Sequence, residues 1–232
     1  MATKSTPGIT RTTPQVLLFR RQLMRWFRRQ GRRLPWRETR DPYHIVVSEF
    51  MLQQTQVSRV EQYYHTFLNQ YPTIHHLARA SSARVRESWQ GLGYYRRAAN
   101  LHLLARQVVQ ERSGEMPRDV EELRKLPGVG RYTAGAVAAF AFERSEPAVD
   151  TNVERVIRRV FFAPRSHASA NRIWDRAASL VPRRGMPAWT FSQAIMELGA
   201  LVCTARVARC DVCPVKSVCR AGMKRGSEAR IK

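Results

Sequence analysis

The sequence predicts an all-α protein. Apolar residues recur at helical spacing along most of the 232 residues, and strand signals are weak throughout. Signals for helix starts precede several of these runs, for example Asp41 followed by Pro42. The one short β-branched stretch, residues 45–47, lies inside the helical pattern that this cap begins. A chain of this length can bury roughly 70% of its unfolded surface, enough for one large core or two small ones.

The predicted helices follow one another closely. The first begins at Pro14, because apolar residues from Val16 to Trp26 recur at helical spacing while arginines occupy other positions and give a basic face. The second follows the cap at Asp41 and includes the stretch EFMLQQ. The remaining apolar runs predict helices near residues 56–69, 73–80, 82–90, 95–112, 118–126, 131–142, 151–161, 169–181 and 189–202.

Positive charge is the unusual feature of the composition. Forty Lys and Arg residues face eighteen Asp and Glu residues, which gives a formal net charge of +22. This balance is typical of a protein that binds a polyanion, and nucleic acid is the expected partner. A ribosome-like or membrane surface would use similar charge, but here the basic residues are spread over the whole chain rather than gathered in a tail.

Neither end of the sequence carries a recognisable targeting signal. Residues 1–14 are polar and rich in Ser, Thr and Pro, so we expect a disordered leader, and we expect residues 221–232 to form a basic tail. No apolar run is long enough for a signal peptide or a membrane span. A reducing, cytoplasmic compartment is therefore expected.

All four cysteines lie close together near the end of the chain. Their pattern is Cys203-x6-Cys210-x2-Cys213-x5-Cys219. Thiols this close in a reducing compartment favour metal ligation over disulfide pairing. Four sulfurs suit a tetrahedral zinc ion or an iron–sulfur cluster, and the spacing leaves both open. Four unrelated buried cysteines are the less favoured explanation.

The stretch LPGVGRYTAG predicts a tight hairpin between two helices. Gly128 and Gly130 flank Val129, and glycines permit such a turn. They also leave backbone N–H groups at the start of the next helix free to bind a phosphate. On the motif alone a simple turn is as good an explanation, but a charge of +22 favours a contact with a DNA or RNA backbone.

Two carboxylates are candidates for chemistry. Glu49 shares a predicted helix face with Ile45, Val46 and Leu52, so its carboxyl group should be partly desolvated and its pKa raised toward neutral, as a general acid requires. Asp150 precedes a predicted helix, whose N-terminus would keep it ionised and able to stabilise a cation. The alternatives are a solvent-edge Glu49 and an Asp150 that only caps its helix. Hydrolysis of a glycosidic bond uses such a pair: one carboxyl group whose pKa is raised, so that it can act as an acid, and one that stays ionised.

Six motifs, in order along the chain, resemble the adenine DNA glycosylases of the MutY type, within the helix-hairpin-helix superfamily that includes endonuclease III. They are LPWRETRDPY, SEFMLQQTQV, GLGYYRRAANLH, LPGVGRYTAGAV, AVDTNVERV and the four cysteines. The resemblance implies the helix-hairpin-helix DNA glycosylase fold, with a six-helix barrel domain over residues 41–145. It places an iron–sulfur cluster domain over residues 15–40 and 146–220, and it favours a [4Fe-4S] cluster over zinc. It also implies a monomer that binds double-stranded DNA containing a mismatch or damaged base, at the nucleoid of a prokaryotic type of cell.

The resemblance assigns roles to individual residues. Glu49 would protonate the adenine and then help activate water, Asp150 would stabilise the oxocarbenium sugar, and Tyr132 and Asn152 would support them. Because Tyr132 replaces the lysine with which bifunctional relatives form a Schiff base, the enzyme is expected to be monofunctional. Gln54, with Leu52 and Tyr94, would wedge into the base stack as the adenine is flipped out. The remaining residues expected to contact the base or the DNA are Arg32, Trp36, Arg37, Gln53, Gly128, Val129, Gly130 and Gln193.

The expected substrate is a mispaired adenine opposite 8-oxoguanine or guanine. The sequence ends soon after the cysteines, whereas typical family members continue into a C-terminal domain that recognises 8-oxoguanine, so it resembles a short form of the family. A branch that removes thymine or uracil opposite guanine is the alternative, although its helix differs at LQQT. A catalytically silent DNA-binding protein is a remote alternative, against which the presence of both Glu49 and Asp150 argues.

Overall fold

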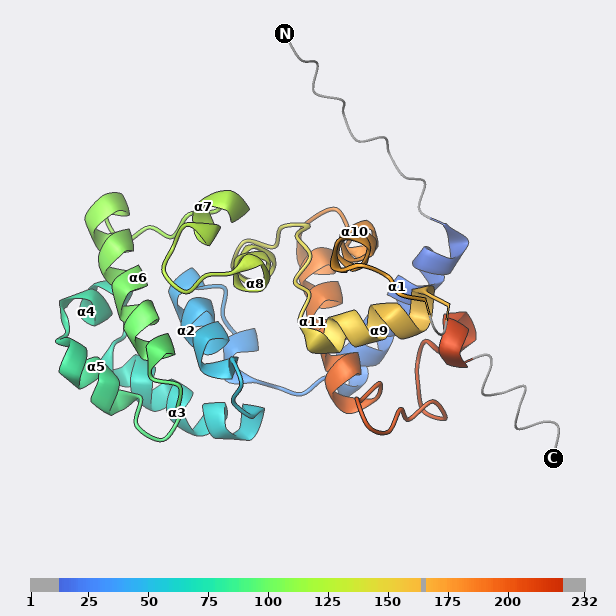
Figure 1. Ribbon diagram of the computed structural model, residues 1–232, viewed down its shortest axis with the longest axis horizontal. Helices are drawn as coiled ribbons and strands as arrows, with labels where there is room; N and C mark the ends of the chain where they lie inside the picture. Colours follow the sequence, from blue (N-terminus) through green and yellow to red (C-terminus); the bar gives the residue numbers. More distant parts are fainter. Residues whose placement is uncertain (1–12, 164–165, 223–232) are drawn as a thin grey trace, which may run out of the picture. The chain divides into compact units, whose positions relative to one another are not determined.

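The computed structural model describes residues 13–163 and 166–222, and these residues are helical, as predicted. Nearly all of the expected leader and basic tail lie outside the described residues. No strand occurs within the two described ranges, where the extended pairing consists of isolated bridges. The helices are α1 (Pro14–Gln30), α2 (Pro42–Leu52), α3 (Val57–Gln70), α4 (Ile74–Arg79), α5 (Ser82–Ser88), α6 (Arg96–Arg112), α7 (Val120–Arg124), α8 (Arg131–Ala141), α9 (Thr151–Phe161), α10 (Ala170–Leu180) and α11 (Met186–Leu201), with the short 3₁₀ helices η1 (Pro35–Arg37) and η2 (Lys216–Val218) (Figure 1).

The chain folds into two compact units, each with its own core. One unit contains the described parts of Met1–Gly31, Thr151–Val181 and Gln193–Lys232, and the other contains Arg32–Asp150 and Pro182–Ser192. The expected boundaries lay at residues 40/41 and 145/146, and residues 182–192 were expected in the unit of the chain ends. In the structure, residues 32–40, 146–150 and 182–192 all belong with residues 41–145 instead. Residues 182–192 are held there because Gly185 N donates to Glu143 O (2.8 Å) and the Arg40 guanidinium stacks on Trp189 at 4.1 Å.

Helix α2 is the central element of the unit that contains residues 32–150. It is apolar on nearly all sides, as a fully enclosed helix must be, and it packs against α3, α6 and α8. Asp41 caps its N-terminus by accepting hydrogen bonds from the backbone N–H groups of Tyr43 (2.8 Å) and His44 (3.3 Å). Small residues line α8, and a Cβ added at Gly135 would lie 2.2 Å from the carbonyl oxygen of Pro147. This close approach fixes the path of the chain toward Asp150.

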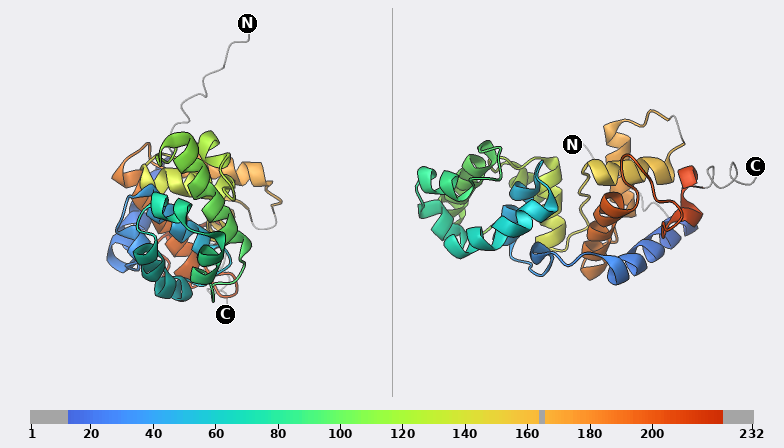
Figure 2. Two further views of the ribbon diagram at one scale, coloured as in Figure 1. Left: turned by 90° about the vertical axis from the view of Figure 1, so that its left-hand side faces the viewer. Right: turned by 90° about the horizontal axis from the view of Figure 1, so that it is seen from below.

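The other unit joins the two ends of the described chain. Helix α1 and η2 pack together, and Gln15 Nε2 donates to the carbonyl oxygen of Val218, 203 positions away (3.1 Å). Their ribbons, blue and red, lie side by side in Figure 2. Phe19 of α1 packs edge to face on Phe161 of α9, with ring centroids 5.0 Å apart. No helix in the described part of the chain is long and apolar enough to cross a membrane.

Candidate active site

Glu49 is buried in the last turns of α2. Its residue is only 4% exposed, as its apolar neighbours on the helix predicted. Burial raises the pKa of Glu49 to about 7; a hydrogen bond from Tyr132 opposes this shift, and the negative charge of Asp150 adds to it. Its Oε2 atom is buried without a hydrogen-bond partner among the described residues. The group therefore changes protonation state near neutral pH and keeps one oxygen available.

Tyr132 and Asp150 lie beside Glu49 although they come from distant parts of the sequence. Tyr132 is the second residue of α8, and its phenol donates the hydrogen bond that Glu49 accepts. Burial, with the negative charges of Glu49 and Asp150, raises the pKa of Tyr132 well above its usual value, so the phenol stays protonated as a donor. The structure thus brings together two carboxyl groups separated by 101 positions, which the sequence alone did not show.

Asn152 belongs to the other unit, where it contacts residues of α9 and α11. Its Oδ1 accepts a hydrogen bond from Arg155 Nη2 (2.7 Å), and Arg155 also donates to the carbonyl oxygens of Gly199 (2.7 Å) and Cys203 (2.7 Å). A Cβ added at Gly199 would lie 2.7 Å from the Cβ of Asn152, so only glycine allows this approach of α11 to α9. Asn152 is therefore held in one position near the start of α9.

The predicted hairpin connects α7 to α8. Gly128 has a φ of +75°, and a Cβ at this position would lie 2.8 Å from the Cβ of Asn100 and 2.9 Å from the ring of Phe50. Gly130 is the N-cap residue of α8 and has no side chain to cap the helix. The first backbone N–H groups of this eleven-residue helix are therefore not capped by a side chain, the arrangement expected of a phosphate-binding helix start.

The residues expected to wedge into DNA lie on two neighbouring turns. Leu52 ends α2, Gln53 follows it, and Gln54 is exposed with a φ of +56°. Tyr94, on the turn before α6, is 61% exposed and has a φ of +47°. Non-glycine residues seldom adopt positive φ, so the exposed Gln54 and Tyr94 are held in strained conformations.

The residues expected to line the base pocket have separate environments. Trp36, in η1, is buried and packs edge to face on Tyr64 with ring centroids 5.5 Å apart. Arg37 Nη1 donates to the carbonyl oxygen of Arg32 (2.9 Å), so these two residues are linked through η1. Gln193 is buried on α11, in the other unit. Their contact with a base stays a prediction.

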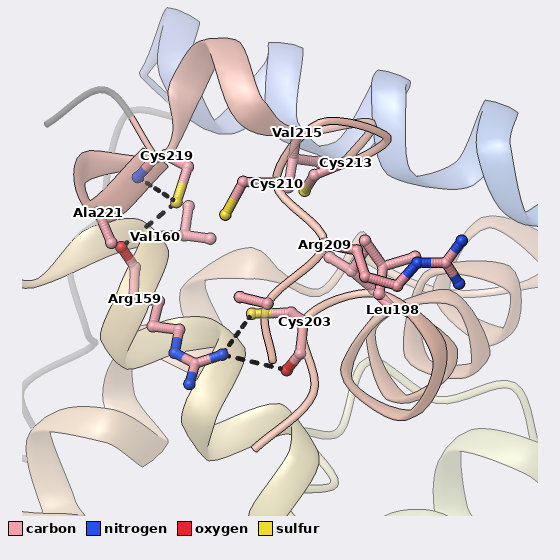
Figure 3. A pocket seen from close by; sticks show the side chains of 13 residues that line it. Arg159, Val160, Leu198, Cys203, Arg209, Cys210, Cys213, Val215, Cys219 and Ala221 are labelled. Atoms are coloured by element: carbon pink, nitrogen blue, oxygen red, sulfur yellow. Dashed lines mark hydrogen bonds between the residues drawn. The ribbon is translucent and has the colours of Figure 1, made fainter. Parts of the chain in front are cut away.

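The four cysteines line one cavity in the unit of the chain ends (Figure 3). All four are free thiols. Burial raises the pKa of the Cys213 thiol to about 11 and also raises that of Cys219. Arg159 contacts this group directly, since its Nη1 lies 3.4 Å from Cys203 Sγ (Figure 3). It also donates to the carbonyl oxygen of Thr204 (2.8 Å).

Within the described ranges, no three Cys, His, Asp or Glu side chains are grouped closely enough to hold one metal ion. The backbone N–H of Gly222 donates to Cys219 Sγ (3.4 Å), the kind of contact that orients a thiolate ligand. The only described side chains in this cavity that are typical metal ligands are the four cysteines, so any metal bound there would be held by sulfur.

Comparisons with known proteins identify relatives of this chain. A family model described as "HhH-GPD superfamily base excision DNA repair protein" matches residues 47–182. The adenine DNA glycosylase of Mycolicibacterium smegmatis is 46% identical over 213 residues, which cover 90% of this chain and 72% of that protein. The adenine DNA glycosylase of Rattus norvegicus is 45% identical over 224 residues, covering 91% of this chain but only 43% of its own length. The chain thus spans less than half of the rat protein.

Solved structures show the same fold. A thermostable thymine-DNA glycosylase matches with a TM-score of 0.84 and 30% identity, over 90% of this chain and 97% of that one. A trapped covalent intermediate of endonuclease III with DNA matches with a TM-score of 0.76 and 27% identity, over 91% and 97% of the two chains. The family model covers more than half of the chain, and most of the Mycolicibacterium protein is matched. The chain therefore belongs to the HhH-GPD superfamily of base excision DNA repair proteins, and within it to the adenine DNA glycosylase family.

Proposed function

We propose that the protein is a monofunctional DNA glycosylase that hydrolyses the N-glycosidic bond of a mispaired adenine in double-stranded DNA. The observation that carries the proposal is the buried Glu49, with a pKa of about 7 and a free Oε2, beside Tyr132 and Asp150. Similarity to adenine DNA glycosylases over about 90% of the chain supports adenine as the base. The opposite base is 8-oxoguanine or guanine.

In the proposed reaction, Glu49 acts first as an acid. Protonated Glu49 donates its proton to a ring nitrogen of the flipped adenine while the bond between the base and C1′ breaks, and the bonding electrons leave with the base. Asp150 stabilises the positive charge that develops on the sugar. Water then adds to C1′, and the Glu49 carboxylate accepts its proton, which regenerates the acid.

Tyr132 defines the class of reaction. Its phenol donates to Glu49, which keeps the carboxyl group in place. A phenol has no amine with which to form a Schiff base, so the abasic product stays intact until alkali cleaves it. Asn152 lies two residues after Asp150 and accepts a hydrogen bond from Arg155, so it supports the start of α9.

DNA is the proposed partner, with a monomeric protein acting in the cytoplasm at the nucleoid. A formal charge of +22 favours binding to a phosphate backbone, and the uncapped start of α8 after Gly128 and Gly130 is suited to one phosphate. Gln54, Leu52 and Tyr94 would occupy the base stack while the adenine is flipped out. Arg32, Trp36 and Arg37 would contact the flipped base.

A [4Fe-4S] cluster is the proposed cofactor, held by Cys203, Cys210, Cys213 and Cys219. The sulfur-only donor set fits such a cluster, and Arg159 would balance part of the negative charge of four thiolates. The resemblance to the adenine DNA glycosylases, rather than the spacing of the cysteines, favours the cluster over a zinc ion. The cluster would supply structural organisation of residues 203–219, and no step of the reaction requires it.

Single-turnover base release tests the function. Four duplexes would carry adenine opposite 8-oxoguanine, adenine opposite guanine, thymine opposite guanine, and uracil opposite guanine, each assayed with and without alkali. Release of adenine, with strand cleavage only after alkali, is the expected result. Release of thymine or uracil instead would support the alternative that the thymine-DNA glycosylase structure suggests. Binding without any base release would support a catalytically silent protein, and Glu49→Gln is the control for chemistry.

A further inference from the structure

Arg97, the second residue of α6, is a buried cation whose partners are almost all backbone carbonyl groups. The residue is 7% exposed. Its Nη1 donates to the carbonyl oxygens of Phe50 (3.0 Å), Met51 (2.8 Å) and Gln53. Its Nη2 donates to the carbonyl oxygens of Leu92 (3.0 Å) and Gly93 (3.1 Å) and to another acceptor, the Thr55 hydroxyl (3.0 Å). No described Asp or Glu forms an ion pair with it.

These acceptors explain why the site takes a guanidinium group. Phe50 and Met51 lie in the last turn of α2, whose carbonyl groups have no partner within the helix and carry the negative end of its dipole. Leu92 and Gly93 belong to the turn before α6. The planar fork of an arginine can donate to both segments at once, whereas a lysine ammonium is a single point charge on a flexible chain. Arg97 therefore joins the end of α2 to the turn before its own helix.

Each joined segment carries one exposed residue in a strained conformation. Gln54 follows Gln53, which Arg97 contacts, and Tyr94 follows Gly93, which Arg97 also contacts. The Arg97 guanidinium also lies against the Tyr94 ring, 5.4 Å from its centroid. Positive φ angles at non-glycine residues persist only where the surrounding structure enforces them. Arg97 contacts both segments through its hydrogen bonds.

We propose that Arg97 is a positioning residue that fixes Gln54 and Tyr94 relative to each other, so that both enter the DNA base stack as one rigid wedge. The inference rests on the proposed function for the wedge role of those two residues. The hydrogen bonds of Arg97 go to these two segments and not to Glu49, so we expect it to act through the wedge and not on the base. Its loss should therefore slow base unstacking and leave phosphate contacts in place.

Arg97→Lys is the main test, because it keeps the charge and removes the fork. The first readout is the fluorescence of 2-aminopurine as target base, with Glu49→Gln in both proteins so that no bond is cleaved. The second is single-turnover base release with Glu49 intact. We expect about 10- to 100-fold slower unstacking and base release, the size of effect that small misplacements cause, with DNA affinity changed less than about threefold.

A double-mutant cycle separates positioning from general stabilisation. In a protein that carries Gln54→Ala and Tyr94→Ala, adding Arg97→Lys should cause no further loss of unstacking, because the residues that it positions are gone. An equal loss in both backgrounds would overturn the proposal. Thr55→Val is a milder second variant, since it removes one acceptor of Arg97 Nη2. It should slow unstacking less than Arg97→Lys does.

Arg20→Lys is the matched control. Arg20 also donates to backbone carbonyls at the end of a helix, those of Ser179, Leu180 and Val181 in the last turn and C-cap of α10, but it contacts neither wedge segment. Like Arg97→Lys, the Arg20→Lys variant should destabilise the fold by removing hydrogen bonds from a guanidinium group to carbonyls at a helix end. It should leave the unstacking of 2-aminopurine unchanged. Equal slowing in Arg20→Lys and Arg97→Lys would count against a specific role for Arg97.

Hydrogen exchange without DNA distinguishes a wrong inference from a wrong function. In Arg97→Lys, the amides of residues 52–55 and 91–95 should exchange at least about tenfold faster, while those of residues 45–47 in α2 remain protected. Unchanged exchange in both segments would overturn the coupling, whatever the enzyme releases. Faster exchange without base release from any duplex would support the coupling and count against the proposed glycosylase.

Discussion

At the scale of single residues, Glu49 has a carboxyl group placed to be protonated at neutral pH. Burial is the main cause of its pKa of about 7, and Asp150 adds to it while Tyr132 opposes it. The same environment that supplies an acid also leaves a buried charge when the proton departs. Activity and stability should therefore both change with pH.

Base release should fall as the pH rises through about 7. The proposed first step uses protonated Glu49, and the fraction in that form decreases above the pKa. Glu49→Gln should reduce the single-turnover rate by at least about 100-fold, since an amide cannot supply the proton. Rates measured from pH 5.5 to pH 9 on an adenine mismatch would test this, and a flat profile would contradict the assignment.

Glu49→Gln should also make the fold more stable at high pH. Because the folded-state pKa is raised from 4.5 to about 7, the folded protein binds more protons than the unfolded chain between these values, so stability falls as the pH rises through them. The difference corresponds to about 3 kcal/mol in total. Denaturant unfolding at pH 5 and pH 8 should show a loss of about 2 kcal/mol in the parent and little loss in Glu49→Gln. Parallel losses in both proteins would contradict the buried charge.

What sequence could predict at this scale depends on how local each cause is. The burial of Glu49 follows from apolar neighbours on its own helix, and a pattern can show that. The role of Arg97 does not follow in this way, since Arg96 and Arg97 are adjacent and look alike in the sequence. Its acceptors Phe50 and Met51 are backbone groups, 47 and 46 positions away, which carry no residue-type signal.

At the scale of elements, the start of a helix was predictable where the sequence has a capping residue. Asp41 accepts from two backbone N–H groups at the start of α2, as predicted. Helix α11 was expected to begin near residue 189 but begins at Met186, because the turn at Gly185 already directs the chain into it. The 3₁₀ helices η1 and η2 were not predicted, since three residues are too short for a periodic pattern.

The hairpin between α7 and α8 offers a matched pair of glycine variants. Gly128→Ala should destabilise the fold by about 1–3 kcal/mol, because the position has a φ of +75° and the new Cβ would meet Asn100 and Phe50. Gly130→Ala should change stability by less than about 0.5 kcal/mol, since nothing lies within 4 Å of its Cβ position and its φ is ordinary. Urea unfolding of the three proteins checks this, and equal effects would contradict the hairpin geometry.

The cysteine segment should bind iron in a sulfur-ligated cluster. Purified protein should be brown, with a broad absorption near 400 nm, and should contain roughly four irons and four acid-labile sulfides per chain. Cys213→Ser should lose most of this absorption, because it removes one of the four proposed thiolate ligands. A colourless protein that contains one zinc ion per chain would contradict the cluster.

At the scale of the whole molecule, charge should dominate DNA affinity. If the protein neutralises about six phosphates, its affinity should fall by about 10³-fold between 50 and 200 mM salt. A perfectly paired duplex should show the same salt dependence, since phosphate contacts carry no sequence information. Binding titrations at four salt concentrations measure both slopes. A salt-independent affinity would contradict an electrostatic DNA surface.

The division into two units was only partly visible in the sequence. The resemblance to the glycosylase family implied one unit built from both ends of the chain, but it gave no reason to place residues 182–192 with residues 32–150. That placement depends on a backbone hydrogen bond from Gly185 to Glu143 and on the contact of Arg40 with Trp189. Both are tertiary contacts between residues with no periodic relation.

The discontinuous unit also has a consequence for synthesis on the ribosome. Residues 32–150 emerge as one continuous segment, so α2 to α8 can pack while the rest of the chain is still being made. Helix α1 emerges earlier than any of them, yet Phe161, on which its Phe19 packs, is translated 142 positions after Phe19. The apolar side of α1 therefore stays uncovered during most of translation. Helix α1 is therefore made before α2 to α8 but finds its packing partner after them, so chaperone binding to its apolar side during synthesis is expected.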